Sequence, residues 1–156
     1  MINLNISTMI YQPIRRVFNF MSVPENDFQW QYGILASARL SEEASTIGTL
    51  FRSISHLMGR RIESTFEVTE YEPNKKYSFK SLSGPLNSQT SYSFEIANGS
   101  TKITVSTQAN VVNFFQVGEA ILEKKMKKQL KEDLAMLKDI LEKKQKLQAP
   151  ENSFAG

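Results

Sequence analysis

Residues 117–146 read VGEAILEKKMKKQLKEDLAMLKDILEKKQK, and this stretch decides the fold. Its apolar residues recur every three or four positions, which predicts a long helix with one apolar stripe and a Lys- and Glu-rich opposite face. Such a stripe must be buried, and an apolar sheet face elsewhere in the chain is the candidate of matching size. A coiled-coil dimer is the rival interpretation, although about three heptads is the minimum for such a coil. The stripe consists of Leu122, Met126, Leu130, Leu134, Leu137 and Leu141.

Alternating apolar and polar residues precede this helix and predict a run of antiparallel strands. In the segment 34–40 the alternation places Ile34, Ala36, Ala38 and Leu40 on the apolar face. Turns are indicated at Met58-Gly59, at Glu72–Lys75 and, most strongly, at Asn98-Gly99. The predicted strands cover residues 2–10, 34–40, 47–57, 60–71, 76–82, 90–96 and 103–111.

Two short helices are predicted between the first two strands, because Pro13 and Pro24 suit first helical turns. The second of them ends near Trp30. One strand, two short helices, several antiparallel strands and a long helix together predict an α+β fold. In this fold a curved sheet wraps around the helix and encloses a space.

The 156 residues suit one domain, which we place at residues 1–147, with a disordered tail at 148–156 rich in Pro, Asn, Ser and Gly. Cysteine is absent, which excludes disulfides and Cys-based sites and fits a cytoplasmic location. No signal peptide is visible, and no apolar run approaches the roughly 20 residues of a membrane-spanning helix. We therefore expect no stable membrane insertion.

The net charge of +3 is concentrated near the C-terminus, where residues 114–148 hold nine Lys and six acidic residues. Acidic residues interrupt the lysines and no aromatic residues are interleaved with them, so a solvated helix face is favoured over a nucleic-acid surface. A partner- or membrane-associated module that uses this basic helix together with Phe114 and Phe115 stays open as an alternative.

Several short segments resemble one family in their order along the chain. They include PIRRVF at 13–18, NDFQW at 26–30, IGT at 47–49 and, most specifically, the turn VTEYEPNK at 68–75. GSTKI at 99–103 and LAMLK at 134–138 complete the set. Together, across residues 2–143, they resemble the helix-grip fold of the START and pollen-allergen (SRPBCC) superfamily, in its polyketide cyclase/dehydrase-type branch.

This resemblance implies a seven-stranded antiparallel sheet, two short helices and one long C-terminal helix around a cavity. It also implies that the cavity takes a hydrophobic small molecule or lipid. Members of the superfamily include lipid carriers, hormone receptors and aromatase/cyclases. They share no catalytic motif that could be carried over to this chain.

No catalytic residue, metal ligand or cofactor is predicted. His56 is the single histidine, and the strand phase that turns Phe51 inward puts His56 outside together with Arg52. The carboxylates of the strand at 60–71 alternate with apolar residues, as outward positions do. We therefore expect His56 to be dispensable.

Aromatic residues and a few hydroxyl groups on the predicted concave side are the candidate ligand-binding residues. The predicted function is binding or carriage of a hydrophobic small molecule or lipid. The alternative is a cyclase or dehydratase in the same cavity, with Tyr92 as proton donor. The oligomeric state stays open. The candidate residues are Trp30, Phe51, Ser64, Phe66, Phe79, Thr90, Tyr92, Phe94, Thr107, Leu122 and Met126.

Overall fold

A seven-stranded antiparallel sheet forms the body of the protein in the computed structural model, which describes residues 1–43, 45–111 and 118–155. The strand order is β1-β7-β6-β5-β4-β3-β2, so all neighbours are consecutive in the chain except β1 and β7. This confirms the predicted sheet. The strands are β1 (Ile2–Ile10), β2 (Ile34–Arg39), β3 (Leu50–Leu57), β4 (Arg60–Glu72), β5 (Lys76–Ser81), β6 (Leu86–Ala97) and β7 (Ser100–Val111).

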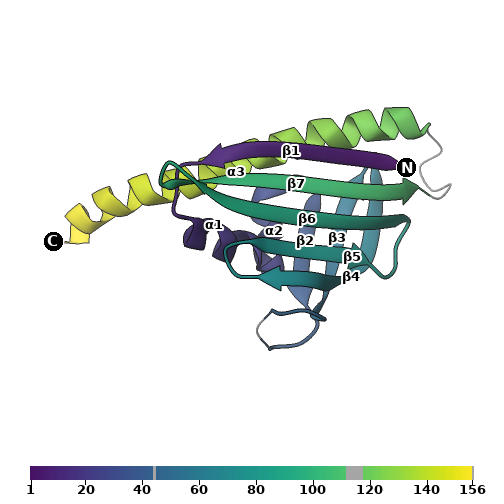
Figure 1. The fold of residues 1–156 in the computed structure, drawn as a ribbon, viewed down its shortest axis with the longest axis horizontal. Helices are drawn as coiled ribbons and strands as arrows, with labels where there is room; N and C mark the ends of the chain where they lie inside the picture. Colours follow the sequence, from purple (N-terminus) through teal and green to yellow (C-terminus); the bar gives the residue numbers. More distant parts are fainter. Residues whose placement is uncertain (44, 112–117, 156) are drawn as a thin grey trace.

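The helices lie on one side of this curved sheet. α1 (Ile14–Met21), the 3-10 turn η1 (Pro24–Asn26) and α2 (Asp27–Trp30) connect β1 to β2, and α3 (Glu119–Ala155) follows β7. Figure 1 shows α3 running along β1, with α1 and α2 set within the curve of the strands. This is the helix-grip arrangement.

Two-residue loops set the register of two hairpins. Met58 and Gly59 have φ angles of 54° and 76°, and Asn98 and Gly99 have φ angles of 51° and 77°. Positive φ at both loop positions is the backbone twist that a tight hairpin requires. The turns predicted at these two places are confirmed, and they fix which side chains of β3, β4, β6 and β7 face inward.

The apolar stripe of α3 is buried inside this one chain. Leu134, Leu137 and Leu141 are at most 3% exposed and share a core with Val17 and Phe18 of α1. The stripe thus packs as the sheet-docking interpretation predicted, and in this part of the helix it leaves no apolar seam for a coiled-coil partner. No helix among the described residues is long and apolar enough to cross a membrane.

The face predicted for β2 is wrong. The register between β2 and β3 shifts between Ile34 and Ala36, and this bulge inverts the alternation beyond it. Ser37 is therefore the buried residue, and its hydroxyl group donates to Ser53 Oγ at 3.0 Å, whereas Ala36 and Ala38 are exposed.

Several predicted strand boundaries also differ from the structure, and β6 and β7 begin at Leu86 and Ser100, earlier than predicted. β3 begins at Leu50, because Gly48 adopts a φ of 90° that no extended strand uses, and Ile47 is exposed ahead of it. α3 is assigned from Glu119 through Ala155, and the disordered tail expected from residue 148 stays a prediction. Phe114 and Phe115 lie outside the described residues.

Candidate ligand-binding site

A cavity of about 240 Å³ lies between the concave face of the sheet, α2 and α3. Its walls come from all seven strands, from α2 and from the first half of α3, so it occupies the space that the long helix spans. Ligand pockets usually measure roughly 300–1,000 Å³. This cavity is therefore of a size for a compact molecule.

Most of the side chains proposed from the sequence meet in this cavity. Those on strands share the inward phase of their strands, and Trp30 and Met126 come from α2 and α3. Those that line it are Trp30, Phe51, Ser64, Phe66, Phe79, Thr90, Tyr92, Thr107 and Met126.

Phe94 and Leu122 are the exceptions, because neither lines the cavity. Phe94 packs edge-on against Phe18, with ring centroids 5.2 Å apart, so α1 fills the space beside it. Leu122 is fully buried in a second apolar cluster that contains Ile2 and Ile62. Both residues have the predicted inward direction but sit where the interior is filled.

An aromatic cluster forms the apolar wall. Phe51 and Phe66 stack with centroids 5.1 Å apart, and Phe79 meets both rings edge-on. Trp30 packs at 6.0 Å against Tyr92, a tilted edge contact that joins α2 to β6. Aromatic contacts of this kind stabilise by about 0.5–1.5 kcal/mol each beyond the area they bury, so the wall is preformed.

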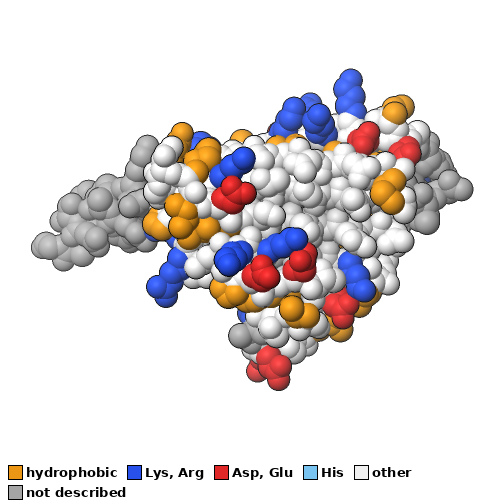
Figure 2. Space-filling view, viewed as in Figure 1, with side chains coloured by type: hydrophobic (Ala, Val, Ile, Leu, Met, Phe, Trp, Pro, Cys, Tyr) orange, Lys and Arg blue, Asp and Glu red, His pale blue; other side chains and the backbone are white. Residues whose placement is uncertain are grey.

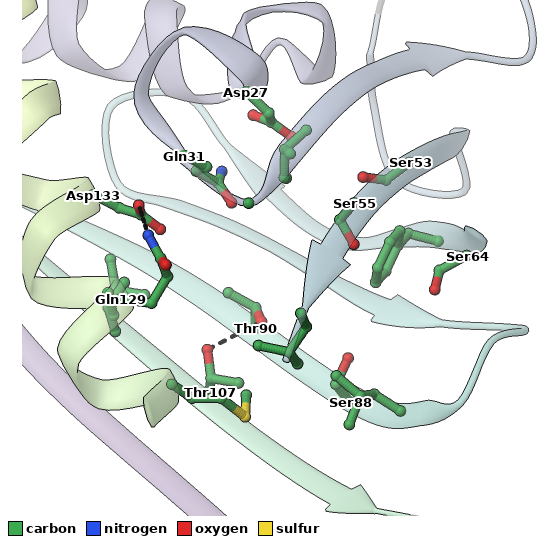
Figure 3. A pocket seen from close by; sticks show the side chains of 18 of the residues that line it. Asp27, Gln31, Ser53, Ser55, Ser64, Ser88, Thr90, Thr107, Gln129 and Asp133 are labelled. Atoms are coloured by element: carbon green, nitrogen blue, oxygen red, sulfur yellow. Dashed lines mark hydrogen bonds between the residues drawn. The ribbon is translucent and has the colours of Figure 1, made fainter. Parts of the chain in front are cut away.

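Hydroxyl groups interrupt this wall at separate points. Thr90 and Thr107 share a hydrogen bond of 3.2 Å across β6 and β7. Figure 3 shows the cavity with serines on the side of β3, β4 and β6 and with carboxyl and amide groups on the opposite side. The labelled groups on those two sides are Ser53, Ser55, Ser64 and Ser88, and Asp27, Gln31, Gln129 and Asp133.

Asp27 brings a carboxyl group into this mainly apolar space. The residue is 6% exposed, and no hydrogen bond to its carboxyl group is found among the described residues. Burial, reinforced by the nearby charge of Glu25, raises the pKa of Asp27 well above its usual range. Burial therefore favours the neutral, protonated form of this carboxyl group unless a cation lies beside it.

Asp133 brings a second carboxyl group from α3. Its Oδ1 accepts a hydrogen bond from the backbone N–H of Tyr32 at 3.0 Å and another from Gln129 Nε2 at 2.9 Å. Burial raises its pKa to about 6, against the opposing effect of these two donors. At neutral pH this carboxyl group is therefore mostly ionised.

The phenol of Tyr92 is affected by both of these acids. Burial raises the pKa of its phenol well above the usual value, and the charges of Asp27 and Asp133 act in the same direction. Its hydroxyl group stays protonated and is a hydrogen-bond donor at any physiological pH.

His56 is exposed, and it borders the cavity from the end of β3. This agrees with the outward phase that the sequence predicted, and no acid or base partner of His56 is found in the described part of the chain.

The described residues also contain no cluster of three or more His, Asp or Glu side chains that could hold a metal ion.

The acidic and amide side chains that line the cavity were not predicted from the sequence, although their spacing indicates a polar role. Asp27 stands three and four residues before Trp30 and Gln31, which puts all three on one side of a helical turn. Asp133 stands three residues after Leu130 and four before Leu137, so it interrupts the apolar stripe. A carboxylate within a stripe that must be buried indicates a polar task there.

The sequence model of the family "polyketide cyclase / dehydrase and lipid transport" matches residues 1–142. The chain belongs to this family. Its fold and cavity agree with that membership, which the segments at 13–18 and 68–75 had indicated. No curated protein matches the chain in a sequence search.

Solved structures with this fold share little sequence with the chain. A START superfamily protein from Mycobacterium smegmatis has a TM-score of 0.78 at 14% identity, covering 92% of this chain and 99% of its own. The protein TTHA0849 from Thermus thermophilus has a TM-score of 0.76 at 16% identity, with coverages of 88% and 94%. The di-domain ARO/CYC BexL has a TM-score of 0.71 at 15% identity, with coverages of 91% and 47%. At such identities the likeness shows the fold.

Proposed function

We propose that the protein binds a compact apolar molecule in the cavity between the sheet and α3. The observation that carries this proposal is the lining itself, in which a preformed aromatic wall meets a few separate polar groups. Apolar walls supply affinity through burial, and scattered polar groups fix the orientation of the bound molecule. Family membership and fold support the same function.

The size of the cavity narrows the class of ligand. A volume of about 240 Å³ holds a molecule of one or two rings, whereas a diacyl lipid is too large for it. We therefore favour a small hydrophobic molecule over a membrane lipid as the ligand.

The test is titration with Prodan, an uncharged apolar dye with a two-ring naphthalene core, whose fluorescence shifts to shorter wavelength when it leaves water. We expect saturable binding with one dye per chain. The substitution Ser88→Trp places an indole ring into the cavity from β6 and should weaken dye binding at least about tenfold, since an occupied space offers no apolar surface to bury.

Gln89→Trp is the matched control, because Gln89 neighbours Ser88 on β6 but is exposed on the outer face. It should leave dye affinity unchanged. Absence of saturable dye binding to the wild-type protein, or equal weakening in both variants, would contradict the proposal.

A second candidate function is acid-catalysed ring closure in the same cavity. It is favoured by one observation, namely that burial keeps both Tyr92 and Asp27 protonated. In such a reaction an enol carbon of a poly-β-ketone chain attacks a ketone carbon of the same chain. The ketone oxygen takes a proton from Tyr92, and the proton released by the enol returns to the phenolate. Ring formation that Tyr92→Phe abolishes while dye binding persists would identify this activity.

A further inference from the structure

Two acidic side chains line the cavity near α2, and no basic side chain stands beside them in the described lining. Asp27 of α2 and Asp133 of α3 both line it, and no Lys or Arg is found among the described residues of the lining. Arg39 acts electrostatically on Tyr77, which packs against Tyr92, but Arg39 is already paired with Glu25 at 3.2 Å. The end of the cavity near α2 therefore holds acids without a counter-charge.

Both carboxyl groups have unused hydrogen-bonding capacity. Asp27 is more than nine-tenths buried, yet within the described chain no donor or acceptor pairs with its carboxyl group. For Asp133 both donors reach Oδ1, and no hydrogen bond to Oδ2 is found among the described residues. Buried polar groups are nearly always paired, so such vacant oxygens beside a cavity are where a ligand donor is expected.

The two carboxyl groups lie on the same side of the cavity (Figure 3). Each of them acts on the phenol of Tyr92, and Figure 3 shows Asp27 and Asp133 on the same side of the cavity with Gln31 between them. The rings of Trp30 and Tyr92 lie at this end as well and offer aromatic faces.

We propose that the cavity selects apolar molecules that carry a protonated amine, and that Asp27 and Asp133 hold the ammonium group. This inference rests on the proposed binding function and names its ligand class. A cation beside a buried carboxyl group favours the ionised form, so Asp27 gives up its proton to solvent when the ammonium group binds. The three donors of the ammonium group then match the vacant carboxyl oxygens, and its charge is attracted by aromatic faces.

The same geometry disfavours anionic ligands such as fatty acids. A ligand carboxylate would lose its hydration and face Asp133 with no neighbouring cation to compensate it. Like charges brought together in a desolvated site reject a ligand as effectively as a steric clash. An uncharged alcohol should fall between the two.

The test uses three ligands with the same apolar body, namely 4-butylbenzylamine, 4-butylbenzyl alcohol and 4-butylbenzoic acid. Each is titrated at pH 7.5 by calorimetry into the wild-type protein. We expect the amine to bind at least about tenfold more tightly than the alcohol, since its ion pair forms in a desolvated site, and the acid to bind most weakly. An acid that binds as tightly as the amine overturns the inference.

Two isosteric variants locate the interaction. Asp133→Asn and Asp27→Asn should each weaken the amine at least about fivefold while changing the affinity of the alcohol by less than about twofold, because only the amine uses the carboxylate charge. Asp139→Asn removes a carboxylate from the exposed side of α3 and should change neither affinity. Unchanged amine affinity in both cavity variants would overturn the assignment of Asp27 and Asp133.

The outcomes separate this inference from the function on which it rests. If the alcohol and the dye bind but the amine has no advantage, the cavity binds apolar molecules and the amine selectivity is refuted. If neither the dye nor any of the three ligands binds, both the proposed function and the amine selectivity are refuted.

Discussion

At the scale of single residues, the carboxyl group of Asp133 links α3 to the segment after α2 through the backbone N–H of Tyr32. Its pKa is raised from 3.8 to about 6, mainly by burial. The folded protein therefore holds this proton more tightly than the unfolded chain does. The contribution of Asp133 to the unfolding free energy is largest below pH 4 and is lost as the pH rises through 6.

The substitution Asp133→Asn removes this titration while keeping an oxygen that can accept from Tyr32. In the wild type, the titration of Asp133 should lower the unfolding free energy by about 1–2 kcal/mol between pH 5 and pH 8. The variant should lack this loss. Urea denaturation at the two pH values measures it. The exposed Asp139→Asn should retain this loss, and an identical pH dependence in wild type and Asp133→Asn would contradict the burial argument.

At the scale of elements, the docking of α3 depends on its apolar stripe. Leu134 is 3% exposed in the main core, whereas Lys131 on the same helix is exposed. Leu134→Ala should lower the unfolding free energy by about 2–5 kcal/mol, the usual range for a buried leucine that leaves a cavity. Lys131→Ala should change it by less than about 0.5 kcal/mol.

Thermal and urea unfolding of these two variants measure how much the docking of α3 on the sheet contributes to stability. Similar small effects at both positions would mean that the helix does not need the sheet for its stability. A large effect at Lys131 would mean that the polar face carries contacts beyond those seen here.

The elements were predictable wherever periodicity and turn residues agreed. Asn98-Gly99 set the β6–β7 hairpin, and the alternation around Phe51 gave the correct inward face of β3. β2 was mispredicted because a bulge is a property of pairing between strands, and Ile34–Arg39 alone carries no sign of the shift.

The candidate site was predictable only in its apolar part. Inward aromatic residues such as Phe66 follow from strand phase, but which of them border empty space depends on how α1 and α3 fill the interior. Phe94 shows this, since Phe18 occupies the space that its phase alone would leave open. The acids escaped prediction because Asp27 and Asp133 meet only after α2 and α3 are brought together in three dimensions.

At the scale of the whole molecule, charges of both signs lie next to one another on the outer face of the sheet. Figure 2 shows acidic and basic side chains next to one another over the strands, with basic side chains also gathered along α3. The pairs Lys76–Glu70 and Lys80–Glu67, at 3.2 and 3.6 Å, belong to this surface. Exposed pairs of this kind contribute little to stability, so the fold depends on its interior.

The burial of the first residues of β1 in the interior gives a further prediction. Ile2 is fully buried between β7 and α3, although terminal residues are usually dispensable. Ile2→Ala should lower the unfolding free energy by about 2–5 kcal/mol. Asn3→Ala, on the exposed face of the same strand, should change it by less than about 0.5 kcal/mol. Equal stability of the two variants would show that the buried face of β1 is not needed for the stability of the fold.

The pairing of β1 with β7 also has a consequence during synthesis. Ile2 pairs with Ala109, so β1 leaves the ribosome before the other six strands and has no partner from β7 until more than 100 further residues have been made. At about 5–20 residues per second, this wait lasts roughly 5–20 seconds. Throughout that time the apolar face of β1 is available to chaperones, and the cavity cannot exist before translation has passed β7.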